Sequence, residues 1–181
     1  MTDLTQFEEH IGITFENKNL LKQAFVHRSY LNENKDFHLG HNERLEFLGD
    51  AVLELVITDY LYNKYPEKHE GDLTSLRSAL VNANTLHTVG VDLGINDLLM
   101  LSRGEAKDKG RARQYILANT MEAIIGAIYL DQKYESARKF IYAFICPLLD
   151  KVIDDESWID SKSLFQEEAQ ERAKITPSYK V

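Results

Sequence analysis

The stretch HNERLEFLGDAVLELV, residues 41–56, decides the fold, because it combines a helical hydrophobic pattern with a run of acids. At about 100° per residue, these two kinds of residue separate onto opposite sides of a helix. The hydrophobic side carries Leu45, Leu48, Val52 and Leu55, and the acidic side carries Glu43, Glu46, Asp50 and Glu54. The pattern predicts an amphipathic helix over residues 43–64, with Asn42 as its N-cap and Pro66 just past its end.

The acidic side of this helix has a simple interpretation as a solvated face, which amphipathic helices usually have. Two details argue against that interpretation. Phe47 lies on the acidic side, where an exposed aromatic indicates that another surface covers it. No Lys or Arg follows these acids four residues later, so their mutual repulsion has no local relief. We therefore expect a positive partner, and a metal ion is the obvious candidate.

A second helical stretch, LANTMEAIIGAIYLD (117–131), supplies further oxygen atoms. Asn119 and Glu122 lie three residues apart on one face, and the small residues Ala123 and Gly126 beside them let another helix approach closely. A lone Glu in so apolar a helix is costly to bury without a partner. If the two helices cross, the side chains that form an all-oxygen cluster are Glu46, Asp50, Asn119 and Glu122.

This predicted cluster suits Mg²⁺, with Mn²⁺ as a possible substitute, because hard cations prefer carboxylate and amide oxygens. A di-iron site is the main competitor, but it needs Glu-x-x-His motifs. No Glu in this sequence has a His three residues later. For Glu122 a structural alternative stays open, in which its carboxylate only supports the ligands or caps a neighbouring group.

The rest of the chain predicts an all-α domain over residues 1–153. Helical periodicity dominates, and no long strict alternation marks a strand. The segment 102–110 is polar and punctuated by glycine, so it is expected to be a loop. Helices are expected near residues 3–11, 18–28, 43–64, 73–92, 95–101, 112–131 and 134–153.

After this domain the composition becomes polar and acidic over residues 154–160, which indicates a linker. Residues 161–173 then have the pattern of a short new helix, and TPSYKV (176–181) is typical of the start of a strand. A helix and part of one strand cannot bury a core alone. We expect residues 161–181 to be the N-terminal fragment of a second, α+β domain.

Composition also narrows the function. The formal net charge of −8 argues mildly against a nucleic-acid binder, although local basic patches can override it. Cys146 is the single cysteine, so neither an intramolecular disulfide nor a Cys-based zinc site can form. The N-terminus lacks the apolar core of a signal peptide, and no apolar run reaches the roughly 20 residues that span a bilayer. We expect a cytoplasmic protein with no membrane partner.

Four stretches in order resemble the blocks of the ribonuclease III family. They are FVHRSYLNE (25–33), NERLEFLGDAVLELV (42–56), PEKHEGDLTSLRSALVN (66–82) and LANTMEAIIGAIYLD (117–131). The resemblance covers about residues 5–150, and residues 160–181 resemble the opening of the double-stranded-RNA-binding domain of bacterial members. It implies the all-helical endonuclease fold of that family and a homodimer with one cleft between two sites.

The activity that the resemblance implies is Mg²⁺-dependent cleavage of double-stranded RNA, with 5′-phosphate products and short 3′ overhangs. The substrates would be ribosomal and other structured precursor RNAs, and no nucleotide cofactor is needed. By motif position, Glu46, Asp50 and Glu122 correspond to metal-binding or catalytic carboxylates. Asp50 and Glu122 are expected to be the catalytic residues whose loss costs most. Asn119 stands where many members have Asp, so the site has one negative charge fewer and is expected to need more Mg²⁺.

The resemblance also assigns residues around the site. Glu43 and Glu70 match accessory acids near the cleft, and Phe47 matches a residue that docks into the partner subunit. The alternative for Phe47 is a core side chain on an irregular helix.

RNA binding needs basic side chains, because double-stranded RNA is gripped through its phosphates and 2′-hydroxyls. The loop SRGEAKDKGRARQ (102–114) is rich in them, against only Glu105 and Asp108. We interpret it as a phosphate-binding arm, with an ordinary solvated loop as the alternative. Its basic residues are Arg103, Lys107, Lys109, Arg111 and Arg113.

Two other functions stay open. A non-enzymatic relative would bind duplex RNA or ribosomes without cutting, and a metal-dependent phosphohydrolase would act on other substrates. The retention of Glu46, Asp50 and Glu122 argues against the first.

Overall fold

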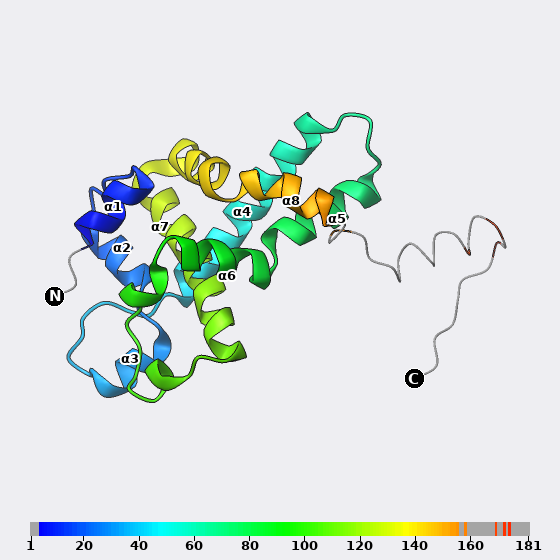
Figure 1. Cartoon of the computed structure of the whole chain (residues 1–181). Helices are drawn as coiled ribbons and strands as arrows, with labels where there is room; N and C mark the ends of the chain where they lie inside the picture. Colours follow the sequence, from blue (N-terminus) through cyan, green and yellow to red (C-terminus); the bar gives the residue numbers. More distant parts are fainter. Residues whose placement is uncertain (1–3, 156–157, 159–168, 170–171, 173, 175–181) are drawn as a thin grey trace.

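The computed structural model describes residues 4–155 together with residues 158, 169, 172 and 174. Its elements are helices, and in the described residues the only strand-like feature is an isolated bridge between Val26 and Met100. The α-helices are α1 (Thr5–Ile11), α2 (Lys18–Ala24), α3 (Arg28–Glu33), α4 (Glu43–Lys64), α5 (Glu70–Val81), α6 (Ala83–Asp92), α7 (Arg111–Phe144) and α8 (Leu149–Asp154). Short 3₁₀ turns are η1 (Ile95–Leu98), η2 (Glu105–Lys107) and η3 (Cys146–Leu148). The predicted all-α architecture is confirmed (Figure 1).

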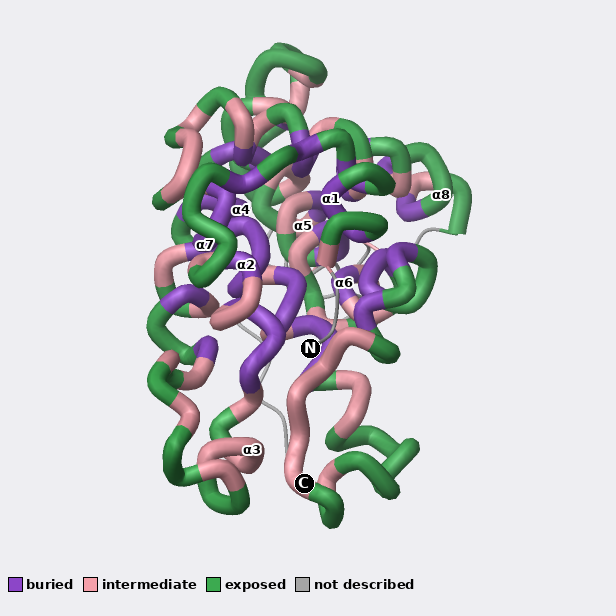
Figure 2. Tube along the Cα trace, turned by 90° about the vertical axis from the view of Figure 1, so that its left-hand side faces the viewer, coloured by how far each residue is buried: buried purple, intermediate pink, exposed green. Residues whose placement is uncertain are grey.

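The long helices α4 and α7 cross in the middle of the molecule, and α2, α5 and α6 pack around them. Figure 2 shows the buried parts of the chain gathered at this crossing, whereas the region around α3 is intermediate or exposed. Two glycines make the crossing close. A Cβ at Gly49 would overlap the backbone carbonyl of Glu122, and a Cβ at Gly126 would overlap that of Leu45. The close approach predicted from Gly126 is therefore present, and Gly49 provides the other half of it.

Helix α4 has the predicted bounds, but its start is built differently from the expectation. Asn42 provides no side-chain cap, because its side chain is buried and its amide donates to the Ala24 carbonyl at 3.0 Å. Its backbone carbonyl instead accepts from Leu45 and Glu46 at 2.8 and 2.9 Å. The predicted hydrophobic side is also too wide, because Leu55 is 58% exposed.

The helix expected over residues 73–92 is two helices, α5 and α6. Asn82 separates them with extended backbone angles, and its side-chain oxygen accepts a hydrogen bond from Thr85 N at 2.9 Å. A capping asparagine favours the start of a new helix over continuation of the old one. The prediction was wrong because hydrophobic periodicity continues across the break.

Other boundaries also differ from the predictions. The helix expected over 18–28 ends at Ala24, and Val26 then forms the bridge to Met100 before α3 begins. The helix expected over 95–101 is only the turn η1. The gap expected between residues 131 and 134 is a kink inside α7, where Lys133 has φ 69°. The final helix expected over 134–153 is interrupted by η3, with Pro147 in its first turn.

The predicted linker and second domain fall largely outside the described residues, which stop being continuous after residue 155. Those predictions stay predictions. Among the described helices, none combines the length and apolar character that crossing a bilayer requires.

Candidate metal-binding active site

The α4–α7 crossing brings the predicted acids together. Because Gly49 lies against the backbone of Glu122, the turn of α4 that carries Glu46 and Asp50 faces the turn of α7 that carries Asn119 and Glu122. The Asn119 amide hydrogen-bonds to the Glu46 carboxylate. Glu122 feels the negative charges of Asp50, Glu46 and Glu54. Residues separated by about 70 positions in sequence therefore share one electrostatic site.

Burial and like charge act on the protonation of this cluster. Desolvation raises the pKa of Glu122 to about 8, and Asp50, Glu46 and Glu54 add to the shift in that order. Desolvation also raises the pKa of Glu46, with further contributions from Glu43 and Asp50, while the hydrogen bond from Asn119 lowers it. Both shifts mean that the cluster holds more negative charge than its surroundings stabilise.

Arginines from other helices neutralise the ends of the acidic row. Arg28 of α3 lies 3.4 Å from Glu43, and Arg77 of α5 lies 2.8 Å from Glu54. Arg77 also donates to the Thr58 hydroxyl at 3.1 Å. The positive charges beside these two acids are thus supplied by arginines of other helices.

The middle of the row has no such relief. Among the residues that the structure describes, no Lys or Arg forms an ion pair with Glu46, Asp50 or Glu122. An acid pair or triad held together without a cation is electrostatically unfavourable. The charge pattern therefore makes the centre of the crossing the candidate place for a bound cation.

The side chains offer carboxylate and amide oxygens, which fits a hard divalent cation by ligand type. In the described part of the chain, however, no three His, Cys, Asp or Glu side chains converge as a ready-made set of ligands. Asn119 is an amide and lies outside that set of residue types. The residues fit the ion chemically, and the coordination geometry stays a prediction.

The accessory acids are placed differently from one another. Glu43 lies at the first turn of α4, beside Glu46, and pairs with Arg28 and with His41 at 3.7 Å. Glu70 begins α5, where its carboxylate accepts a hydrogen bond from the Thr74 hydroxyl at 3.0 Å. It is not among the acids that shift the pKa of Glu122, so within one chain Glu70 lies apart from the cluster.

Glu70 instead lines a cavity of about 420 Å³ between α4 and α5. The other lining residues are Thr58, Leu61, Tyr62, Lys68, Leu73, Thr74 and Arg77. Phe47 lies on the same helix as three of them and is 80% exposed. The alternative of Phe47 as a core side chain is therefore wrong.

The segment 102–114 is a loop only as far as Gly110, because α7 begins at Arg111. Its five basic residues divide into two groups. Arg113 donates to the backbone carbonyls of Asp108 and Glu105 at 3.2 and 2.9 Å, so it holds the loop in shape. Arg111 lies over the Tyr115 ring. Side chains without a hydrogen bond or ion pair in the described residues are those of Arg103, Lys107 and Lys109.

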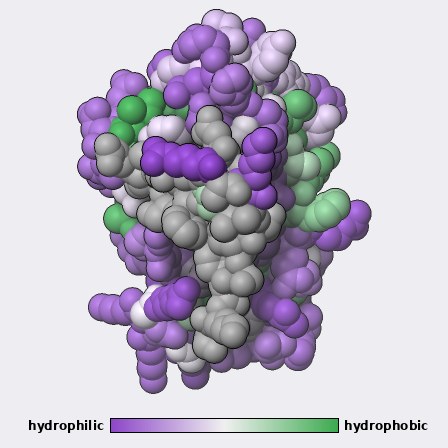
Figure 3. Space-filling view, turned by 90° about the vertical axis from the view of Figure 1, so that its right-hand side faces the viewer, coloured by the Kyte–Doolittle hydropathy of each residue, from purple (hydrophilic) through white to green (hydrophobic). Residues whose placement is uncertain are grey.

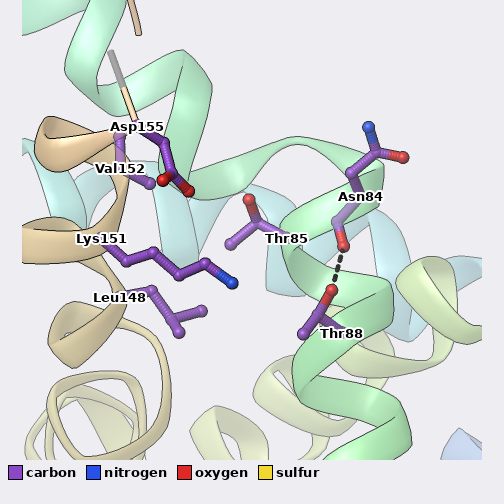
Figure 4. A pocket seen from close by; sticks show the side chains of 7 residues that line it. All are labelled: Asn84, Thr85, Thr88, Leu148, Lys151, Val152 and Asp155. Carbon is purple, nitrogen blue, oxygen red and sulfur yellow. Dashed lines mark hydrogen bonds between the residues drawn. The ribbon is translucent and has the colours of Figure 1, made fainter. Parts of the chain in front are cut away.

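A different cavity, of about 160 Å³, lies between α6 and the α8 end of the chain (Figure 4). Figure 4 shows Lys151 extending from α8 toward α6, where Thr88 donates to the Asn84 carbonyl at 3.0 Å. It contains none of the clustered acids, so it is not part of the candidate site. The face of the molecule shown in Figure 3 is mostly hydrophilic where it is coloured, with hydrophobic residues in small separate groups.

Comparison with solved structures places this fold in a known class. One structure of the nuclease domain of ribonuclease III from Campylobacter jejuni matches with a TM-score of 0.72 and 38% identity, over 79% of this chain and 96% of that domain. Dicer from Giardia, at 21% identity and a TM-score of 0.60, shares the fold over 79% of this chain. The fold formed by the crossing helices thus belongs to the class of ribonuclease III nuclease domains.

Sequence comparison gives the family. The Ribonuclease-III-like family model matches residues 17–149. Ribonuclease 3 of Dehalococcoides mccartyi is 42% identical over 181 residues, which is all of this chain and 76% of the relative. Ribonuclease 3 of Bacillus licheniformis is 44% identical over 179 residues, or 97% of this chain and 70% of the relative. The chain belongs to the ribonuclease III family, and it is an endoribonuclease.

Sequence reasoning missed two features of the site. Gly49 was not singled out, although a glycine seven residues after Asn42 on the helix face toward α7 is the natural counterpart of Gly126. Tyr115 was not singled out either. It is 47% exposed, and its position one turn before Asn119 is the signal that could have found it.

Proposed function

We propose that this chain is a Mg²⁺-dependent endonuclease that cleaves double-stranded RNA, leaving 5′-phosphates and short 3′ overhangs on ribosomal and other structured precursor RNAs. The observation that carries the proposal is the uncompensated centre of the acidic row. Glu46, Asp50 and Glu122 are held together by the α4–α7 crossing, and in the described residues no basic side chain pairs with them. The outer acids, in contrast, each have an arginine.

The residues have distinct roles in this proposal. Asp50 and Glu122 are the catalytic carboxylates, and Glu46 and Asn119 complete the metal-binding set. The Asn119 amide interacts with the Glu46 carboxylate and lowers its pKa. When bound, a divalent cation lowers the pKa of a coordinated water and neutralises charge on the phosphate under attack. Loss of a proton from Glu122, whose pKa is about 8, makes its full charge available for that ion.

We further propose that the enzyme is a homodimer formed through the outer face of α4. The large hydrophobic residues exposed there are Phe47 at 80%, Leu55 at 58% and Tyr62 at 70%. If α4 packs antiparallel to its copy about a twofold axis near Leu55, Phe47 of one subunit lies opposite Tyr62 of the other. Tyr62 lines the 420 Å³ cavity, which thus becomes the receptor for Phe47. One Campylobacter jejuni structure is described as showing flexibility in a region involved in dimer formation of that nuclease domain.

The same pairing gives Glu70 a role. Glu70 lines that cavity, so docking of the partner brings it to the subunit interface, away from its own cluster. We assign Glu70 and Glu43 as accessory acids at the rim of the cleft. Arg103, Lys107 and Lys109, which are exposed, are assigned to the RNA phosphates.

The test is cleavage of a long RNA duplex by the full chain in Mg²⁺. We expect cutting by the unaltered protein, and a loss of at least about 10³-fold in Asp50→Asn and Glu122→Gln, as removal of a key electrostatic group costs in other sites. The matched control is Glu67→Gln, which removes an exposed acid beyond the end of α4 and should cleave normally. Titration of Mg²⁺ by calorimetry should show binding that the two site variants lose.

The competing function is duplex binding without cleavage. It would be supported by an RNA band that is retarded but uncut at all Mg²⁺ and Mn²⁺ concentrations. Turnover of small phosphoesters with intact duplex would instead favour a phosphohydrolase.

A further inference from the structure

The exposed stripe of α7 continues from the acidic site toward the start of the helix. Between residues 116 and 128 only Asn119 and Glu122 are not buried. Arg111 and Tyr115 precede them at helical spacings of eight and four residues from Asn119, so all four lie within roughly 80° on one face. At about 1.5 Å per residue, Tyr115 stands roughly 6 Å and Arg111 roughly 12 Å along the axis from Asn119.

Arg111 and Tyr115 form a pair on this stripe. The Arg111 guanidinium lies 5.8 Å from the centre of the Tyr115 ring, and its Nη2 donates to the Tyr115 hydroxyl at 3.4 Å. Tyr115 is 47% exposed, although it is aromatic and adjoins the hydrophobic part of α7. Stacking on an aromatic face holds a guanidinium in place without neutralising its charge.

The other arginines with a described partner are used differently. Arg28, Arg77 and Arg138 each form an ion pair with a glutamate, and Arg113 donates to backbone carbonyls. Arg111 has no acid within ion-pair distance among the described residues. Its positive charge is therefore both fixed in position and available to an external anion.

We propose that Arg111 binds a backbone phosphate of the RNA strand that enters the acidic site, and that Tyr115 is the positioning residue that holds Arg111 for this contact. The inference rests on the proposed function. A strand whose reacting phosphate lies at Glu122 and which follows the exposed stripe of α7 passes over Arg111. The planar guanidinium suits two oxygens of one phosphate.

In this proposal Tyr115 does not stack on RNA bases. The bases of an RNA duplex are stacked and paired inside the helix, and its surface offers phosphates and 2′-hydroxyls. Tyr115 therefore acts through Arg111. Removal of the Tyr115 ring should weaken the contact between Arg111 and the phosphate, and it should remove no other contact with the RNA.

The test compares Arg111→Ala, Tyr115→Leu, Tyr115→Phe and the double variant Arg111→Ala/Tyr115→Leu in the full chain. For Arg111→Ala we expect KM for duplex RNA to rise about fivefold to tenfold, with kcat within about twofold. The slope of log KM against log salt concentration should decrease by about one, which corresponds to the loss of one phosphate contact. Tyr115→Leu should raise KM by about threefold, as expected for loss of an exposed cation–π contact. Tyr115→Phe should fall between Tyr115→Leu and the unaltered protein.

The decisive comparison is the double-mutant cycle. If Tyr115 acts through Arg111, the double variant has the KM of Arg111→Ala alone. Multiplicative effects in the double variant, or no rise in KM for Tyr115→Leu, would overturn the proposal. Thermal unfolding of each variant verifies that the helix is intact.

The helix contains its own control. Arg138 lies over Tyr142 at 5.4 Å with the same four-residue spacing, on the far side of the Lys133 kink. Arg138→Ala removes the same charge and should leave KM and the salt dependence unchanged. An equal effect there would show that only the overall charge matters, which contradicts a local contact.

The dissociation constant of each variant for duplex RNA in EDTA separates this inference from the proposed function. If the unaltered protein binds RNA but does not cut it, the proposed cleavage fails, and the same cycle in dissociation constants still decides the roles of Arg111 and Tyr115. If the unaltered protein cuts RNA and the variants bind as it does, the inference fails alone. If it does not bind duplex RNA at all, both fail.

Discussion

The two faces of α4 make opposite demands on their residues. The inner face, at Gly49, approaches α7 so closely that a methyl group would overlap the Glu122 carbonyl. The outer face leaves Phe47, Leu55 and Tyr62 more than half exposed. A helix that only filled a core would not combine so close a backbone approach with a phenylalanine that is 80% exposed.

The difference shows what each face is for. Contact between backbones has little freedom to slide, so the inner face fixes the register of Glu46 and Asp50 against Glu122. The exposed hydrophobic area of the outer face fits the proposed contact with a second subunit. The acids lie along the border between the two faces. The inner face fixes their positions, and the exposed side leaves them accessible from outside the chain.

Gly49→Ala is the strongest way to break the inner face. The added methyl meets backbone atoms of α7, which cannot rotate away, so the two helices must separate. We expect a loss of roughly 3 kcal/mol or more in the free energy of unfolding, at the upper end for overpacking. Urea denaturation followed by circular dichroism measures it.

Gly104→Ala is the matched control, because its Cβ would come no closer than 3.9 Å to the Ser102 hydroxyl. It should change stability by less than about 0.5 kcal/mol. Comparable losses in the two variants would show that the crossing is not unusually close.

Phe47→Ala tests the outer face. If Phe47 fills the partner's cavity, its removal should raise the dimer dissociation constant by about 30-fold to 100-fold, as loss of a buried aromatic anchor does at other interfaces. Sedimentation velocity over a concentration series measures this constant. Val91→Ala, at an exposed hydrophobic position on α6, should leave it unchanged; a monomeric unaltered protein would refute the assignment of this face.

Glu122→Gln tests the acidic cluster that lies between the two faces of α4. Burial raises the pKa of Glu122 from 4.5 to about 8, so the folded protein retains a proton that the unfolded chain releases. The stability that this proton provides is complete below about pH 4.5 and is lost as the pH rises through about 8. In EDTA the variant should be more stable by roughly 1–2 kcal/mol at about pH 9, less than the full shift because water still reaches the side chain.

The measurement is the free energy of unfolding of both proteins between about pH 4 and pH 9. The curves should converge at low pH and separate as the pH rises. Parallel curves would mean that Glu122 is not held in an unfavourable environment.

Asn119→Asp is expected to have the smallest effect. The change adds a charged oxygen to the site and replaces the amide that hydrogen-bonds to Glu46. The Mg²⁺ concentration for half-maximal cleavage should fall by about threefold to tenfold, since an added carboxylate strengthens the attraction for a hard cation. An unchanged metal-activation curve would rule out a metal-binding role for Asn119.

Sequence reasoning predicted the helix 43–64 and the approach of α7 through Gly126, because both depend on local periodicity and residue size. It predicted the family from the order of four motifs. It predicted the proximity of the acids from the faces of the two helices, and their role as metal ligands stays a prediction. It did not predict the break at Asn82, where the hydrophobic pattern continues although the backbone turns. Leu55 was assigned to the core for a related reason, since periodicity cannot distinguish a surface that faces the core from one that faces a partner.

The ion pairs between helices also could not be predicted from the sequence. The arginines that neutralise Glu43 and Glu54 come from α3 and α5, and nothing in the sequence of α4 indicates these partners. Their pairing leaves the centre of the row as the uncompensated part, and that asymmetry is visible only in three dimensions.

Under the proposed function, Arg77 would connect assembly of the dimer with the acidic site. Its guanidinium holds Glu54, one of the charges that act on Glu122, and it also lines the cavity assigned to the partner's phenylalanine. Arrival of the partner would strip water from this guanidinium and strengthen its hold on Glu54. In the proposed dimer, the charge of Glu54 would then act less strongly on Glu122 than it does in an isolated subunit.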